Sequence, residues 1–271
     1  MALTTIGLMA LLGCFTGFMA GLLGIGGGMI ITPFLIMLIP SSLIPHDHIV
    51  HVAIATSLAT IAFTSLSSVR AHHKRGAVLW NVVASVAPGI LVGAVVGAQI
   101  AGWLPTFWLS LIFAGFVGFS AFKMFLNKSP RPDRNLPGTM GKFFMGIAIG
   151  ILSALVGAGG GFISVPWMVW CNVKMQNAVA TSAAFGFPIA LFGTIGYIIS
   201  GWNVSGLPPW PIDLGYICIP ALFSVAITSV LFAPLGAKVA HSIDTKPLKK
   251  IFASLLCFVC LYMIRQAYFA M

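Results

Sequence analysis

Uncharged apolar runs, long enough to cross a lipid bilayer, constrain this chain more than any other feature. One run extends from Val82 to Ile100 and contains no charged residue and a single amide, Gln99. An apolar helix of about 20 residues spans a hydrocarbon core about 30 Å thick. Only 7% of the 271 residues are charged and the mean hydropathy is +1.05, which excludes an ordinary water-soluble domain. The sequence therefore predicts an all-α polytopic membrane protein.

Eight apolar segments are expected, of which the first and the fifth are unusual. A single helix over 4–39 would greatly exceed the thickness of the bilayer core. Both segments also contain a glycine cluster, Gly24 with Gly26–Gly28 and Gly157 with Gly159–Gly161, which disfavours a continuous helix. We therefore expect two shorter helices in each, up to ten in all, which either cross twice or dip in and return. The expected segments are 4–39, 49–69, 77–102, 106–126, 141–171, 176–200, 212–236 and 248–269.

The two halves of the chain repeat one another, and the matches keep their order along each half. The matched pairs are Gly17–Pro33 with Gly150–Pro166, Ala55-Thr56-Ser57 with Ala180-Thr181-Ser182, Pro88 with Pro220, and Gly97-Ala98 with Gly236-Ala237. This pattern predicts a first transmembrane repeat over 1–126, a cytoplasmic linker over 127–140 and a second repeat over 141–271. Internal repeats of this kind are common in secondary transporters.

The charges of the loops predict that the two repeats have inverted topology. In the first half the loop between segments two and three carries Arg70, Lys74 and Arg75, and the next loop has no Lys or Arg. In the second half the basic loop is instead the one between segments seven and eight, which begins with Lys238. Under the positive-inside rule, equivalent loops then face opposite sides of the membrane. A broken first segment in each half supplies the required odd number of crossings.

The glycine clusters are the strongest candidates for a binding site. A helix that begins at membrane depth presents unpaired amides and a partial positive charge, which favour an anion. Thr and Ser hydroxyls can donate to an anion without the cost of burying a charge. Close helix packing is the alternative for glycines, and Gly13, Gly17 and Gly21 fit it well; back-bonding is the alternative for hydroxyls. The substrate-binding candidates are Gly26, Gly27, Gly28, Thr56, Ser57, Gly159, Gly160, Gly161, Thr181 and Ser182.

Several other functions find little support in the residues. The chain contains no Glu, and no nucleophile or phosphate-binding motif, so an enzyme is not expected. The basic residues lie in short loops, which argues against a nucleic-acid partner. Neither a metal nor a cofactor is expected, because the stretch from Pro45 to His51 fits a polar turn better than a metal site. If protons are coupled to transport, the candidates are His51, Asp47 and Asp213; His51 and Asp47 would be one turn apart if this stretch were helical.

The two glycine-rich segments LLGIGGGMIITP and LVGAGGGFISVP, each followed by ATS, resemble the TauE/SafE sulfite exporter family over nearly the whole chain. The resemblance implies a multi-pass protein of the cell membrane, either a prokaryotic inner membrane or a plasma membrane, that moves sulfite, sulfonates or related anions, with a site at the glycines and at the Thr-Ser pairs. We therefore expect a secondary transporter of a small sulfur-containing anion that works by alternating access. An anion channel, or a transporter of another small organic anion, is the alternative, and the oligomeric state stays open.

Overall fold

The computed structural model describes residues 3–24, 27–39, 44–126, 135–202, 204, 214–240, 242 and 246–269. These residues form ten helices and no strand beyond an isolated bridge between Leu214 and Ile217. The helices are α1 (Leu3–Leu23), α2 (Gly28–Leu38), α3 (Ile49–His73), α4 (Trp80–Trp103), α5 (Thr106–Leu126), α6 (Thr139–Val156), α7 (Gly161–Trp170), α8 (Met175–Gly201), α9 (Ile219–Ala240) and α10 (Lys246–Phe269).

Eight of these helices are long and apolar enough to cross a membrane, whereas α2 and α7 are shorter. The predicted all-α membrane architecture is therefore confirmed, and the two long glycine-containing segments are each divided into two helices, α1 with α2 and α6 with α7. Helix α3 lies at the centre, with 83% of its apolar window buried, whereas the corresponding share of α9 and of α10 is 33%. Large apolar side chains such as Phe223, Leu231 and Leu261 are exposed on the outer helices, where lipid would cover them.

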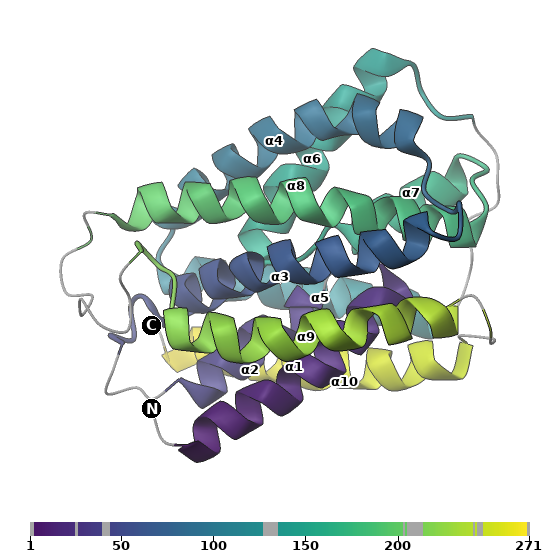
Figure 1. The fold of residues 1–271 in the computed structure, drawn as a ribbon. Helices are drawn as coiled ribbons and strands as arrows, with labels where there is room; N and C mark the ends of the chain where they lie inside the picture. The colour runs from purple at the N-terminus through teal and green to yellow at the C-terminus, as the bar shows by residue number, and fades with distance from the viewer. Residues whose placement is uncertain are drawn as a thin grey trace.

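The largest helix contacts have equivalent contacts when the two halves of the chain are exchanged (Figure 1). Helix α1 packs on α9, and its equivalent α6 packs on α4, which is the equivalent of α9. In the same way α3 contacts α9 and α8 contacts α4. Two further contacts join equivalent helices directly, α3 with α8 and α5 with α10. Each half thus packs mainly against the other, as an approximate internal two-fold axis requires.

The contacts also fix the relative directions of the helices. Gly186 of α8 lies against Ser65 of α3, and Gly193, two turns later, lies against Leu58, so α3 and α8 run antiparallel. In contrast, α1 runs parallel to α9 and α6 runs parallel to α4. The equivalent helices α3 and α8 therefore run in opposite directions where they touch, which is the arrangement expected about an approximate two-fold axis.

Small residues set the closest helix contacts. A Cβ atom added at Gly17 of α1 would lie 2.2 Å from the carbonyl oxygen of Ser229 on α9, and one added at Gly13 would lie 2.4 Å from that of Val225. The packing interpretation of these glycines is thus confirmed. In the other half, Gly146, the equivalent of Gly13, meets the carbonyl of Val86. Val86 therefore corresponds to Val225, and the alignment of Pro88 with Pro220 was wrong by about two turns.

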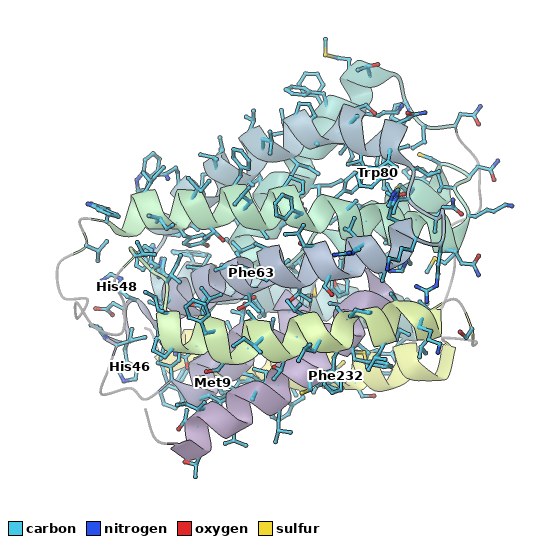
Figure 2. All side chains as sticks on the ribbon, in the orientation of Figure 1. Met9, His46, His48, Phe63, Trp80 and Phe232 are labelled. Carbon is cyan, nitrogen blue, oxygen red and sulfur yellow. The ribbon has the colours of Figure 1, made fainter. Side chains whose placement is uncertain are left out.

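Basic residues gather at one end of the bundle. Helices α3, α5 and α9 end there, and α4, α6 and α8 begin there, near Trp80; His48 lies at the opposite end (Figure 2). Among the described side chains, Arg265 is the one Lys or Arg at the opposite end. The residues at the basic end are Arg70, Lys74, Arg75, Lys123, Lys142, Lys174 and Lys238.

Candidate functional site

The glycines at the edges of the two breaks have matching backbone angles in the two halves. Gly24 and Gly27 have φ of 67° and 74°, and their equivalents Gly157 and Gly160 have φ of 63° and 77°. This left-handed region strains residues with a side chain, which explains why glycine stands at all four positions. The chain therefore leaves the first helix of each half at Gly24 or Gly157 and enters the next after Gly27 or Gly160.

Each break leaves the start of a helix without a side-chain cap. Gly27 precedes α2 and Gly160 precedes α7, and neither can offer a side chain to the first amides. The carbonyl of Gly27 accepts from the amides of Ile30 and Ile31, which are the first amides bonded within α2. The amides of Gly28 and Met29 come before them in the chain. Such helix starts carry a partial positive charge without any charged residue.

The two breaks lie against each other in the interior. A Cβ atom added at Gly28 would lie 1.9 Å from the carbonyl oxygen of Gly157, so no other residue fits at this contact. The hydroxyl of Thr32 lies 3.0 Å from the position of a Cβ at Gly157, is buried, and has no hydrogen-bond partner. Ser153 near Gly160 also has a buried hydroxyl without a partner. The fold therefore brings the two glycine clusters of the sequence into one region.

The two predicted serines each bridge to the opposite half. Ser57 of α3 donates to the carbonyl of Gly157 at 3.1 Å, with that of Gly28 at 3.4 Å. Ser182 of α8 donates to the carbonyl of Gly24 at 3.0 Å, the two-fold equivalent of the bond from Ser57 to Gly157. Ser164 donates to Ser182 at 2.8 Å. Each serine therefore holds the last turn of the broken helix from the other half.

The two predicted threonines also make equivalent bonds, but as acceptors. The hydroxyl of Thr56 accepts from the amide of Cys218 at 2.9 Å, directly before α9. The hydroxyl of Thr181 accepts from the amide of Leu79 at 3.0 Å, directly before α4. Back-bonding within the helix, the alternative interpretation, is seen instead at Thr60 and Thr64. Because a hydroxyl that accepts can still donate, the O–H groups of Thr56 and Thr181 keep a donor to offer.

The candidates for proton coupling differ in their burial. Helix α3 begins at Ile49, so Asp47 lies in the preceding turn, in line with the polar turn that the sequence favoured, and the helical spacing of Asp47 and His51 does not apply. Asp47 is exposed, whereas His51 is buried, with Nε2 3.0 Å from the carbonyls of Ala101 and Leu104 and its ring stacked on Tyr216. Gly26 and Asp213 lie outside the described residues. Within the described ranges, no three His, Cys, Asp or Glu residues come together as metal ligands.

Several residues of this region were not anticipated from the sequence. The backbone amides of Cys218 and Leu79 could not be found by residue type, since any residue supplies an amide. Thr32, Ser153 and Ser164 are isolated hydroxyls in apolar runs, and the sequence does not repeat them: Thr32 corresponds to Val165 and Ser164 to Ile31. Only their position beside the breaks distinguishes them from packing residues.

The chain is similar to known membrane proteins over nearly its whole length. The family model described as "Sulfite exporter TauE/SafE" matches residues 9–263. A "Probable membrane transporter protein" of Haemophilus influenzae is 34% identical over 96% of this chain and 98% of its own length. A probable membrane transporter protein of Bacillus subtilis is 30% identical over 69% of this chain and 76% of its own length. Another, of Methanocaldococcus jannaschii, is 28% identical over 95% of this chain and 94% of its own length. No solved structure matches the chain.

Proposed function

Because this chain belongs to the TauE/SafE family of sulfite exporters, we propose that it is a secondary transporter that moves a small sulfur-containing anion, such as sulfite or a sulfonate, by alternating access. Its relatives are described as membrane transporters, and the family and relatives together indicate a transporter rather than an enzyme. The observation that carries the proposal is the meeting of two uncapped helix starts in the interior, one from each half.

The chemistry of this region suits an anion that must also be released. The starts of α2 and α7 supply amides and partial positive charge, and Thr56 and Thr181 each retain an O–H donor. Among the described residues, the hydrogen bonds and close contacts at the breaks involve no Lys or Arg. A site built from amides and hydroxyls avoids the cost of burying a full charge in the membrane. It also binds an anion less tightly than an arginine pair would, which favours turnover.

The internal two-fold arrangement supplies a route to alternating access. If α3 and α8 both span the membrane, their antiparallel contact makes the halves inverted repeats, with equivalent positions at opposite depths. The bonds from Ser57 to Gly157 and from Ser182 to Gly24 connect the halves at the two breaks. We propose that rearrangement of these two bonds accompanies the exchange between inward-facing and outward-facing states.

The placement of charge sets the orientation in this proposal. Arg70, Lys74, Arg75 and Lys238 at the ends of α3 and α9 would face the cytoplasm under the positive-inside rule. The loop between α4 and α5, which contains Pro105, would then lie outside. The first residues of α1 and the last of α10 also lie at the outer end, and the cell membrane that holds the protein would be the inner membrane in a bacterium.

Transport by purified protein in liposomes tests the function. Sulfite, thiosulfate, a sulfonate and sulfate are offered as labelled anions, and uptake is compared with that of protein-free liposomes. We expect saturable uptake of at least one of these anions. Uptake that rises in proportion to concentration without saturating would support an anion channel instead, and no uptake of any anion would contradict both functions.

A further inference from the structure

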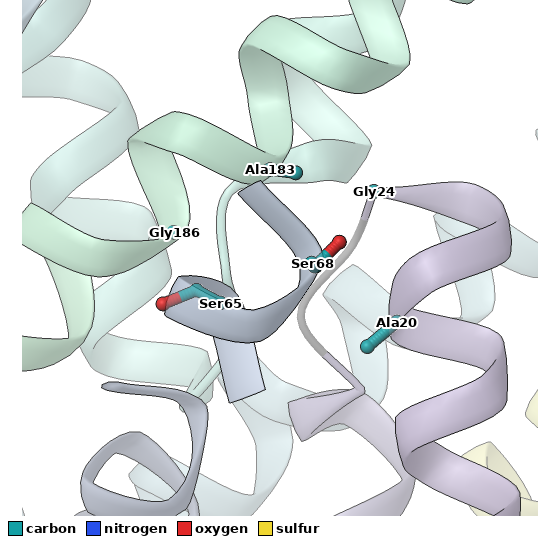
Figure 3. A pocket seen from close by; sticks show the side chains of 6 residues that line it. All are labelled: Ala20, Gly24, Ser65, Ser68, Ala183 and Gly186. Carbon is teal, nitrogen blue, oxygen red and sulfur yellow. The ribbon is translucent and has the colours of Figure 1, made fainter. Parts of the chain in front are cut away.

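A small cavity opens beside one of the two breaks. It lies among α1, α3 and α8 (Figure 3) and has room for about one water molecule. Two of its lining residues, Ser65 and Ser68, lie within five residues of the basic Arg70 near the end of α3. The cavity therefore lies toward the basic end of the bundle. Its lining residues are Ala20, Gly24, Ser65, Ser68, Ala183 and Gly186.

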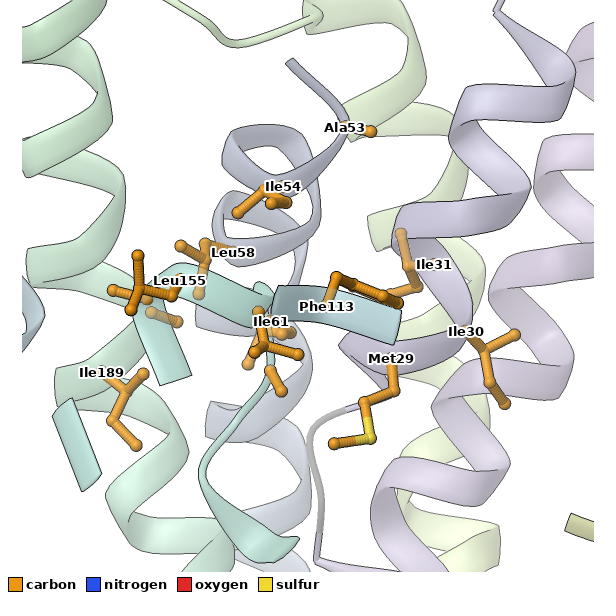
Figure 4. Packing of buried hydrophobic residues seen from close by; sticks show 14 of the residues in the cluster. Met29, Ile30, Ile31, Ala53, Ile54, Leu58, Ile61, Phe113, Leu155 and Ile189 are labelled. Carbon is orange, nitrogen blue, oxygen red and sulfur yellow. The ribbon is translucent and has the colours of Figure 1, made fainter. Parts of the chain in front are cut away.

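The repeat of the two halves allows this cavity to be compared with the equivalent place in the other half, which is called its image below. Counting from the matched Thr56 and Thr181, the positions of Ala183 and Gly186 on α8 correspond to Leu58 and Ile61 on α3. Side chains of one carbon or none on the basic side are thus replaced by two large aliphatic groups at the image. Leu58 and Ile61 have no exposed surface and lie in the apolar cluster with Leu155 (Figure 4).

Contacts at the image confirm that these two side chains fill it. Gly193 corresponds to Ser68 of the cavity, and a Cβ atom added there would lie 3.1 Å from Cδ1 of Leu58. Cδ1 of Ile61 would lie 2.6 Å from a Cβ added at Gly28. The space that is hollow toward the basic end is thus occupied by hydrocarbon toward the opposite end.

Ser68 shows that the cavity is suited to a polar occupant. Its side chain is 2% exposed, and its hydroxyl has no hydrogen-bond partner in the structure. Figure 3 shows this hydroxyl directed toward Gly24, whose carbonyl already accepts from Ser182. A buried hydroxyl without a partner costs free energy, so a ligand that accepts its hydrogen bond is favoured there. An oxyanion offers such acceptors.

We propose that this cavity marks the path by which the anion reaches the breaks from the basic end, that it widens from the space of about one water molecule as the anion enters, and that Leu58 and Ile61 block the equivalent path from the opposite end. Ser68 donates to an oxygen of the anion as it enters. The inference rests on the proposed transport function and adds to it the residues that line the hollow path and those that fill its equivalent. It also assigns the structure to the state that faces the basic, cytoplasmic side.

Reaction of single cysteines with a small anionic thiosulfonate tests this assignment. Ala20 lines the cavity, and Ser153 is its equivalent on α6, so Ala20→Cys and Ser153→Cys are a matched pair. Both are introduced into a chain whose five native cysteines are alanine. Membrane vesicles of the two orientations allow the reagent to be applied from either side.

We expect Ala20→Cys to react from the cytoplasmic side and Ser153→Cys to be protected from both sides. Adding Leu58→Ala and Ile61→Ala should then make Ser153→Cys reactive from the outer side only. Equal reactivity of the two unmodified positions, or reaction of Ala20→Cys from the outside alone, would overturn the proposal. So would continued protection of Ser153→Cys in the double alanine variant, provided that the variant still inserts and migrates as a folded protein.

A transport arm separates failure of this inference from failure of the function. The double variant Ala183→Leu with Gly186→Ile places in the cavity the same side chains that fill its image. It is expected to lose transport of an anion that is supplied on the basic side. Ala183→Ser is the control that keeps the cavity small and polar. If the unmodified protein transports an anion and the filled variant does so equally well, the path is wrong and the function stands. If the unmodified protein transports none of the anions, the function fails, whatever the labelling shows.

Discussion

Removing the hydroxyl of Thr56 or of Thr181 should weaken the fold by similar amounts. Thr56→Val leaves the amide of Cys218 without its acceptor, and Thr181→Val does the same to the amide of Leu79. Cys218 has no exposed surface and Leu79 packs on the apolar core, so water cannot easily replace the lost acceptor. A buried donor left unsatisfied costs about 1–3 kcal/mol. Valine keeps the shape of threonine, so this cost is not mixed with a cavity.

The expected change in thermal unfolding follows from that free energy. For chains of this size about 1 kcal/mol shifts the midpoint by roughly 2–4 °C, so each variant should unfold about 2–12 °C lower. Thr56→Ser and Thr181→Ser retain the acceptor and should unfold close to the unmodified protein. The two bonds share no residue and precede different helices, α9 and α4, so the shifts of the double valine variant should add. The measurement is thermal unfolding of purified protein in detergent, without any anion.

The same variants also test whether these hydroxyls bind the anion. If each O–H donates to it, valine should lower the affinity by about ten- to a hundredfold, which corresponds to about 1.5–3 kcal/mol. Calorimetric titration of the unmodified protein and of the serine controls supplies the reference. Unchanged unfolding midpoints in both valine variants would refute the claim that these two hydrogen bonds stabilise the fold. Unchanged affinity for the anion would remove the threonines from the proposed site.

Three further outcomes are expected. Gly17→Leu should sharply reduce the yield of folded protein, because even a Cβ there would lie 2.2 Å from the carbonyl oxygen of Ser229. Gly115→Leu is the control, since a Cβ at Gly115 has no atom within 4 Å, and equal yields of the two variants would contradict the packing. Cysteine labelling should place Pro105→Cys and Ser205→Cys outside and Ser129→Cys and Thr245→Cys inside; Pro105 and Ser205 on opposite faces would end the inverted-repeat model. The triple variant His51→Ala, Asp47→Asn and Asp213→Asn should abolish any transport of a fully ionised sulfonate that a pH gradient drives. If a pH gradient still drives this transport in the triple variant, other groups carry the proton.

The sequence predicted the fold in those features that depend on hydropathy and on glycine. Long uncharged runs can be satisfied in lipid only as helices, so their number and approximate limits followed directly. The breaks followed because clustered glycines disfavour a continuous helix, and the structure has positive φ at Gly24, Gly27, Gly157 and Gly160. The bounds were less accurate near polar ends: the segment expected over 212–236 is helical over 219–240.

The candidate site was predictable only in part, because most of it depends on packing between the halves. Repetition drew attention to Thr56, Ser57, Thr181 and Ser182, but not to the partners that they reach across the two-fold axis. The alignment of Pro88 with Pro220 failed because both prolines lie in helices whose register is set by glycine contacts rather than by proline. The difference between Ala183 and Leu58 is visible in the sequence, but it has no meaning until the cavity and its image are located.

Counterflow in liposomes tests alternating access more directly than any other measurement. Liposomes are loaded with a high concentration of the unlabelled anion that the uptake assay identifies, and a trace of the labelled anion is added outside. A carrier that must return its site to the outer face exchanges one anion for another, so labelled anion should accumulate transiently above its outside concentration. Entry of label only up to equilibrium, at a rate independent of the internal anion, would contradict alternating access and identify an open pore.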